Sequence, residues 1–172
     1  MNTSVPKTTL CPEFGSLDAE ALSWEYARSV LAEAPLYRAS TVRPDGRPHL
    51  TPLLGVWVEE AGCFCTGPRE RKALNLSANP HCLISTGNNA LDGPPDIVVE
   101  GSGARVEDPD ALERIARAYE EKYGPAITSP EGTWFGLADS IRRRRVLTVR
   151  VTPERAFAFG KAPVFSQTRY DF

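Results

Sequence analysis

The chain has few of the residues that build metal centres and disulfide frameworks. It contains two histidines and four cysteines among 172 residues. These residues are His49, His81, Cys11, Cys63, Cys65 and Cys82. The cysteines form neither a C-x-x-C pair nor a disulfide-dense pattern, and only the two histidines could complete a zinc site. We therefore expect small cysteines buried in strands and no metal site.

Long apolar runs and a strong excess of charge are also missing. No window approaches the roughly 18 consecutive apolar residues that cross a bilayer, and residues 1–12 lack the basic start and apolar run of a secretory signal. The formal net charge is −2, so no long-range electropositive field gathers nucleic acid or anionic lipid. We expect a cytoplasmic protein without nucleic-acid or membrane partners, in which any anion site is local.

Several catalytic signatures are absent as well. The sequence shows no Ser/His/Asp order, no Gly-x-Ser-x-Gly elbow and no Gly-x-Gly-x-x-Gly after a strand, so hydrolase and Rossmann interpretations lack support. His49 has no carboxylate neighbour in the local sequence and is given no base role. The catalytic residues therefore stay unknown at this stage.

The length and the 41% hydrophobic content indicate one domain, residues 1–172, with 1–15 flexible. Helical spacing after Ser16 predicts a first helix that ends before Pro35, and further helices are predicted near 70–78 and 108–124. Predicted strands cover 36–42, 48–58, 63–66, 81–86, 96–106, 146–151 and 156–159. Gly101 and Gly103 suggest a bulge. This order favours a mainly β fold, an antiparallel barrel of six or seven strands with flanking helices.

One segment carries the cations expected of an anion site. Thr66 ends a predicted strand, and Arg69, Arg71 and Lys72 lie at the start of the next helix. Backbone N–H groups at a helix start favour an anion, and arginine adds donors that suit phosphate. By spacing alone, solvated surface is the commoner outcome for such a segment.

Five stretches of the sequence resemble the pyridoxamine 5'-phosphate oxidase-like FMN-binding split barrels. They are Thr66 with 71–73 and 79–80, the hairpin 39–48, residues 99–101, residues 104–106, and residues 165–170. The resemblance covers most of the chain from about Leu36 onward, apart from 124–145. It implies a split β-barrel.

The resemblance also implies a cofactor site. Thr66, Arg71 and Lys72 would hold the FMN phosphate, and Asp96 stands where the family usually offers a glutamine to the flavin. The edge of the isoalloxazine ring would lie along Leu50, Thr51, Pro52 and Leu53. Family members are homodimers with the cofactor at the subunit interface, so the second subunit would contribute Arg169.

Departures from the family pattern narrow the expected function. Phe165 and Gln167 stand where true pyridoxamine phosphate oxidases grip their substrate with a basic residue and a histidine. Oxidation of vitamin B6 is therefore not expected. Leu50 or Thr51 replaces an arginine expected on the second strand.

Lys72 is followed by Asn75-Leu76, and Thr168-Arg169-Tyr170 stands near the C-terminus. In these segments the chain is also similar to actinobacterial flavin/deazaflavin oxidoreductases, of which some use FMN and others the deazaflavin coenzyme F-420. We expect an FMN- or F-420-dependent oxidoreductase that transfers hydride to a small conjugated or aromatic substrate. The alternative is a non-catalytic protein that sequesters flavin or haem.

The arginine run, two of the tryptophans and the C-terminal tail also allow predictions. The four arginines of 142–145 are expected to be solvated, with the acidic tail of a deazaflavin as a second interpretation. Trp57 is expected in the core, and Trp134 is expected in a loop as a substrate lid or as cover at a dimer seam. The tail 165–172 is expected to have no strand partner in its own chain.

Overall fold

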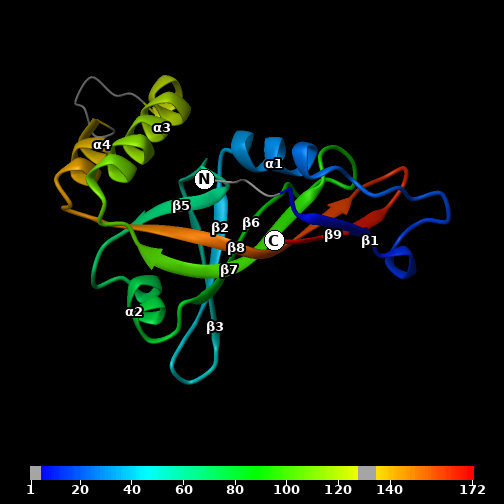
Figure 1. Ribbon diagram of the computed structural model, residues 1–172, viewed down its shortest axis with the longest axis horizontal. Coiled ribbons are helices and arrows are strands. Elements are labelled where there is room, and N and C mark those ends of the chain that lie inside the picture. The colour runs from blue at the N-terminus through cyan, green and yellow to red at the C-terminus, as the bar shows by residue number, and fades with distance from the viewer. Residues whose placement is uncertain (1–4, 128–134) are drawn as a thin grey trace.

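The computed structural model describes residues 5–127 and 135–172, which form one antiparallel sheet with helices around it (Figure 1). The strands are β1 (Lys7–Leu10), β2 (Tyr37–Val42), β3 (Pro48–Leu53), β4 (Gly55–Val58), β5 (Ala61–Thr66), β6 (His81–Thr86), β7 (Asp96–Arg105), β8 (Leu147–Gly160) and β9 (Ser166–Asp171). The helices are η1 (Pro12–Phe14), α1 (Trp24–Glu33), α2 (Arg71–Ala78), α3 (Pro109–Ile127) and α4 (Phe135–Arg142). The predicted mainly β split barrel with flanking helices is confirmed, with nine strands described where six or seven were predicted.

Strand β8 divides the sheet. Its first residues, Leu147–Val151, pair with β5, and its last residues, Arg155–Gly160, pair with β9, while β7 pairs along both parts. The sequence predicts two strands here, but the continuous partner β7 keeps them as one strand of 14 residues. The register of β7 shifts between Glu100 and Gly101, so the predicted bulge is confirmed.

The predicted strand 48–58 is wrong as a single element, because the chain changes partners at Leu54. Strand β3 pairs with β2, and β4 pairs with β5. Helix α3 holds the chain at this change of partner. Its Tyr123 hydroxyl lies 3.0 Å from Gly55 N and 2.7 Å from Gly55 O. These bonds pair the main-chain groups of Gly55 at the start of β4.

The first helix begins later than predicted. Ser23 caps α1 by accepting from Tyr26 N at 3.2 Å. Ser16, the predicted cap, instead accepts from Phe165 N at 3.1 Å, and Leu17 is fully exposed. Ser16 therefore anchors the chain beside β9.

The predicted helix end at Gly124 and the predicted loop that follows also need correction. Helix α3 runs through Gly124 to Ile127, because Gly124 does not take the positive φ that would stop the helix. Helix α4 then occupies 135–142, within the predicted loop. Trp134, the predicted lid or seam residue, lies outside the described residues.

Both chain ends of the described structure are tied into the sheet. Strand β1 lies within the segment 1–15 that was expected to be flexible, and it pairs with β9. The tail expected to lack a partner forms β9, which pairs with β8 as well. Tyr170 is fully buried, and its hydroxyl donates to Leu22 O at 2.9 Å. Deleting residues 166–172 would therefore remove part of the core.

Two clusters of buried side chains hold the layers together. Helix α1 packs Ala27 and Leu31 against the sheet, and Trp57 joins this cluster with its ring 6.0 Å from Trp24, which confirms the expected core position of Trp57. Helices α3 and α4 pack Tyr119 and Ile141, among others, against β4 and β5. Figure 1 shows α1 above the sheet and the α3–α4 pair at one end of it. No helix among the described residues has the length and apolar character needed to cross a bilayer.

We predict that Gly101→Ala destabilises the barrel at the bulge. A Cβ at this position would overlap the carbonyl oxygen of Thr152 in β8, a main-chain atom that cannot turn aside. Overpacking of this kind lowers the free energy of unfolding by roughly 2 kcal/mol and the melting temperature by roughly 5 °C. Thermal denaturation followed by circular dichroism measures the change.

Gly136→Ala is the matched control, because its Cβ would enter open space on α4. Alanine favours a helix over glycine by roughly 0.5–1 kcal/mol, so the control should unfold at the same or a slightly higher temperature. Equal effects of the two substitutions would contradict the role of the Gly101 bulge.

Candidate cofactor site

The segment between β5 and α2 forms the centre of the candidate site. Thr66 ends β5 and is buried, and Glu70 stands at the N-cap of α2 with extended backbone angles. Asn75, fully buried on α2, donates from Nδ2 to Thr41 Oγ1 of β2 at 2.9 Å. This bond fixes the helix against the barrel, as the order of strand, short loop and helix predicts.

Lys72 is buried although it carries a charge. Only 6% of the residue is exposed, and its ammonium donates to Glu70 Oε2. The other oxygen, Glu70 Oε1, accepts from Gly67 N at 2.6 Å. The hydrogen bonds from Lys72 and then Gly67 hold the pKa of Glu70 below its usual value. A carboxylate of the chain thus takes up the donors that a bound anion would use.

His49 of β3 connects this ion pair to two further cationic side chains. His49 of β3 lies close enough to Arg43, Lys72 and Arg71 for all three charges to lower its pKa, although burial of the imidazole is the larger cause. A lowered pKa leaves the His49 ring neutral at pH 7. Arg71 itself is exposed. The sequence places Arg43 and His49 far from Lys72, and only the folded hairpin brings them to the start of α2.

Three buried polar atoms of this region lack a hydrogen-bond partner among the described residues. They are Arg43 Nε, His49 Nδ1 and Asn75 Oδ1. Buried polar groups are nearly always paired with protein, water or ligand. Two nitrogen atoms near a buried ammonium fit the oxygen atoms of a phosphate. The residues present therefore fit a phosphate-bearing cofactor.

Strand β3 is an edge of the sheet and has a free backbone side. Arg43 N donates to Arg47 O at 2.9 Å, and this pairing sets the alternation along the hairpin. Pro48, Leu50 and Pro52 then turn their backbone groups outward, and prolines have no N–H. Within β3, Leu50 N–H is thus the one outward donor.

Side chains of β3 alternate in the same way. Leu50 is 58% exposed and Pro52 is exposed, whereas Thr51 and Leu53 are half-buried toward the barrel interior. A planar ligand laid along this edge would meet the backbone of Leu50 and Pro52. The other two predicted ring residues support the strand from inside.

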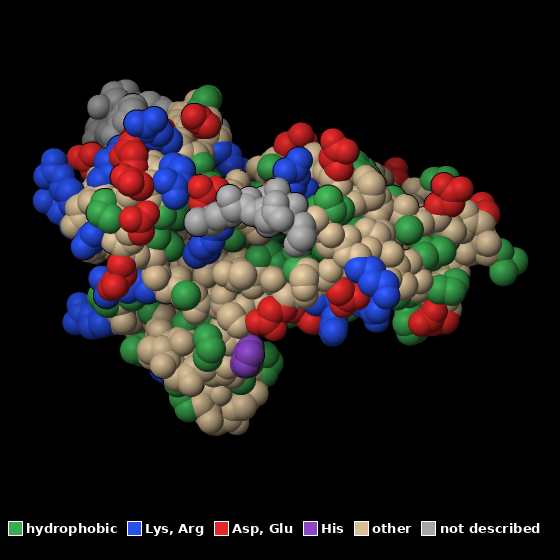
Figure 2. All heavy atoms as spheres, viewed as in Figure 1, with side chains coloured by type: hydrophobic (Ala, Val, Ile, Leu, Met, Phe, Trp, Pro, Cys, Tyr) green, Lys and Arg blue, Asp and Glu red, His purple; other side chains and the backbone are tan. Residues whose placement is uncertain are grey.

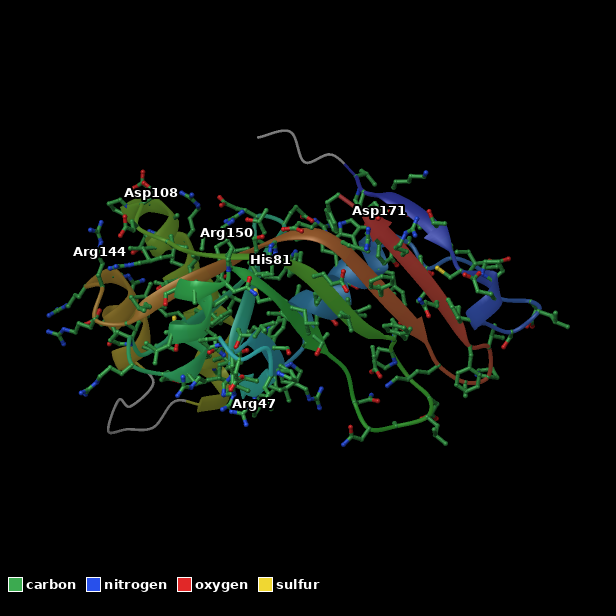
Figure 3. The ribbon with its side chains drawn as sticks, turned by 90° about the horizontal axis from the view of Figure 1, so that it is seen from below. Arg47, His81, Asp108, Arg144, Arg150 and Asp171 are labelled. Atoms are coloured by element: carbon green, nitrogen blue, oxygen red, sulfur yellow. The ribbon has the colours of Figure 1, made fainter. Side chains whose placement is uncertain are left out.

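The two remaining predicted site residues lie elsewhere. Asp96 begins β7, three strands away from β3, and its carboxylate lies 2.7 Å from Lys161 Nζ. Arg169 in β9 donates from Nε to Asp171 Oδ2 at 3.0 Å. Thr66 pairs with Leu147 of β8, and Arg169 pairs with Phe157, ten residues further along the same strand, which is roughly 30 Å. Figure 3 likewise shows Asp171 of β9 and Arg47 of the hairpin well apart. One chain does not bring Arg169 to the start of α2.

Arg142, the first of the four arginines at 142–145, connects α4 to α3. Arg142 of α4 bonds Glu113 at 2.7 Å and Glu120 at 2.8 Å, both on α3. The bonds from Arg142 and Arg117 lower the pKa of Glu113 to about 2. Figure 2 shows basic and acidic side chains intermingled over this end of the molecule. Solvation alone therefore does not describe Arg142, whereas the next three arginines are exposed.

A cavity of about 860 Å³ lies between α1 and β8. Its charged rim is already paired internally, since Arg28 bonds Glu60 at 2.9 Å and Arg150 bonds Glu59 at 3.2 Å. None of the predicted site residues lines it. All four cysteines are free, and no group of three potential metal ligands occurs among the residues that the structure describes.

Residues 23–159 match the family described as pyridoxamine 5'-phosphate oxidase. The chain belongs to this family. The match covers the hairpin, the start of α2 and β7, so the resemblance predicted from these segments is confirmed. No curated protein matches the sequence.

Solved structures of the same fold include proteins of different kinds. The conserved hypothetical protein Rv2991 from Mycobacterium tuberculosis is 23% identical with a TM-score of 0.65, and the match covers 78% of this chain and 82% of that one. HutZ, the heme storage protein from Vibrio cholerae, is 17% identical with a TM-score of 0.61 over 78% and 93%. An F-420 reductase is 27% identical with a TM-score of 0.51 over 74% and 94%.

We predict opposite effects for two substitutions at the start of α2. Lys72→Ala removes a charge-assisted contact to phosphate and should weaken FMN binding about tenfold to a hundredfold. Glu70→Gln removes a competing anion whose side chain is half exposed, so it should tighten FMN binding only about twofold to fivefold. Quenching of flavin fluorescence measures both affinities.

Riboflavin and Glu107→Gln provide the controls. Riboflavin lacks the phosphate and should bind both variants as it binds the wild-type protein. Glu107 pairs with Arg105 at 3.6 Å on the surface of another part of the chain, so its substitution should leave FMN binding unchanged. Unchanged FMN affinity in Lys72→Ala would refute the assignment of the phosphate site.

Proposed function

We propose that the protein is an oxidoreductase that uses FMN or the deazaflavin coenzyme F-420 and acts on a small conjugated or aromatic substrate. The observation that carries this proposal is the buried Lys72 ammonium near His49 of the edge strand β3, together with Arg43 Nε and His49 Nδ1, which are buried without a hydrogen-bond partner among the described residues. Membership of the pyridoxamine 5'-phosphate oxidase family supports the same assignment. Phe165 and Gln167 argue against pyridoxamine phosphate itself as substrate.

The residues divide the binding of the cofactor between them. Lys72, Arg71 and the Thr66 hydroxyl hold the phosphate, and displacement of Glu70 frees the Lys72 ammonium for it. The outward backbone groups of Leu50 and Pro52 contact the edge of the ring. When bound, a flavin or deazaflavin supplies hydride transfer, while the chain binds and orients it.

Two identical chains complete the site in this proposal. Arg169 lies far from Thr66 and Lys72 along β8 within one chain, so in this proposal it reaches the cofactor across a dimer interface. The exposed Leu50 and the uncovered edge of β3 are surfaces that a second copy would cover. The cofactor would then lie between the subunits.

A second candidate function is storage of haem or flavin without turnover. The specific observation in its favour is the likeness of the fold to a heme storage protein. Haem is commonly held by an axial histidine, and His49 and His81 are the two histidines of the sequence. His49 is half-buried and neutral near pH 7, so it is the better ligand of the two.

We predict that the purified full-length protein binds FMN or F-420 in titrations followed by visible absorbance, with micromolar or tighter affinity, and binds haem more weakly. The bound cofactor, once reduced, should be reoxidised by a conjugated or aromatic acceptor. Tight haem binding that His49→Ala abolishes, together with no cofactor binding, would overturn the oxidoreductase proposal. Cofactor binding without reoxidation by any acceptor would favour the storage function.

We also predict that Arg169→Ala weakens cofactor binding about tenfold, because one charge-assisted contact is lost across the dimer interface. Arg105→Ala, which removes an exposed arginine of β7, is the matched control and should have no effect. Light scattering should report a dimer for all three proteins. A monomer that binds cofactor at full affinity would show that the site is built within one chain.

A further inference from the structure

The outer face of the sheet carries a separate pocket of about 320 Å³. Its lining includes Arg38, Ser85, Asn88, Asp96, Val98 and Phe159. Arg38, Ser85 and Val98 are register partners on β2, β6 and β7, so their side chains share one face of the sheet. The volume suits a small molecule rather than a few waters.

Arg38 is the unusual residue of this pocket. It is half-buried, and among the described residues its guanidinium makes no hydrogen bond or ion pair. Many other arginines of the chain bind a carboxylate, as Arg150 binds Glu59 and Arg155 binds Asp171. A partly desolvated guanidinium without a partner favours an anion.

The acid in the pocket does not neutralise Arg38. The Asp96 carboxylate lies 2.7 Å from Lys161 Nζ, and that ammonium also donates to Asn88 O at 3.0 Å and Asn88 Oδ1 at 2.8 Å. The Lys161 side chain is only 9% exposed, so the pair is a fixed wall of the pocket. Among the described residues, no carboxylate therefore compensates the positive charge of Arg38.

The pocket also adjoins the proposed cofactor edge. Arg38 lies opposite Pro52 of β3, one of the residues assigned to the edge of the ring, and points to the same face. Phe159 and Val98 supply apolar walls, and Ser85 supplies a neutral hydroxyl. An anion held at Arg38 would therefore extend its apolar part along these walls.

We propose that this pocket binds the carboxylate of the substrate, which is then a small aromatic or conjugated carboxylic acid. The carboxylate pairs with the Arg38 guanidinium, and the planar part of the acid packs on Phe159 and Val98. This inference rests on the proposed function for its link to the cofactor. Binding of the acid itself does not depend on that link.

Benzoate is the probe, and benzamide is its neutral isostere. In NMR titrations of the full-length protein, benzoate should shift the amide signals of Arg38, Ser85 and Asn88. Arg38→Ala should weaken benzoate binding about tenfold to a hundredfold and leave benzamide binding unchanged. Arg38→Gln keeps most of the side-chain volume but not the charge, and it should show the same loss of benzoate affinity. An equal loss in both variants would show that the effect comes from the missing charge and not from misfolding.

Arg155→Ala is the matched control, because Arg155 lies on the same outer face but is paired with Asp171 at 3.1 Å. It should leave benzoate binding unchanged. Equal benzoate affinity in Arg38→Ala, Arg38→Gln and the wild-type protein would overturn the proposal. A change from dimer to monomer in Arg38→Ala, without loss of benzoate binding, would instead show that a second copy of the chain pairs with Arg38.

FMN and F-420 titrations of the same variants separate this inference from the proposed function. Both cofactors should bind Arg38→Ala as they bind the wild-type protein. If neither cofactor binds the wild-type protein but benzoate binding depends on Arg38, the pocket stands and the proposed function is wrong. If a cofactor binds the wild-type protein while the benzoate affinity of Arg38→Ala equals that of the wild-type protein, the pocket assignment is wrong.

Discussion

Strand β2 lies between β3 and β6, and its register against both decides which side chains share a face. Thr41 points inward, where it receives the Asn75 amide and so fixes α2. Arg38 points outward, beside Pro52 on one side and Ser85 on the other. A shift of one residue would exchange these faces, because side chains alternate along a strand. The start of α2 and the outer pocket thus depend on the same pairing.

The positive charge of Lys72 at the start of α2 is largely shielded from solvent. Burying an ammonium is unfavourable unless a partner compensates it, and Glu70 supplies that partner. Glu70 is half exposed while Lys72 is not, so the carboxylate can leave for solvent when another anion arrives. The neutral His49 nearby adds a polar atom without adding a further positive charge.

The two proposed sites lie on different surfaces of one strand pair. The phosphate site faces α2 and the hairpin, and the carboxylate pocket faces the open side of the sheet. Pro48 and Pro52 keep the edge of β3 from pairing with a further strand, since neither has an N–H to donate. An edge that cannot extend the sheet stays available for a planar ligand.

Local signals in the sequence determined much of this protein. The turn at Pro44-Asp45-Gly46, with Gly46 at φ 84°, set the hairpin, and the order of strand, loop and cations marked Thr66, Arg71 and Lys72. Long-range pairing decided the rest. The partner change at Leu54, the continuity of β8 and the pairing of β9 arise from contacts between residues distant in the chain, which local periodicity does not encode. The same contacts brought His49 near Arg43 and Lys72, placed Arg38 beside Pro52 with no ion pair among the described residues, and carried Arg169 far from the start of α2.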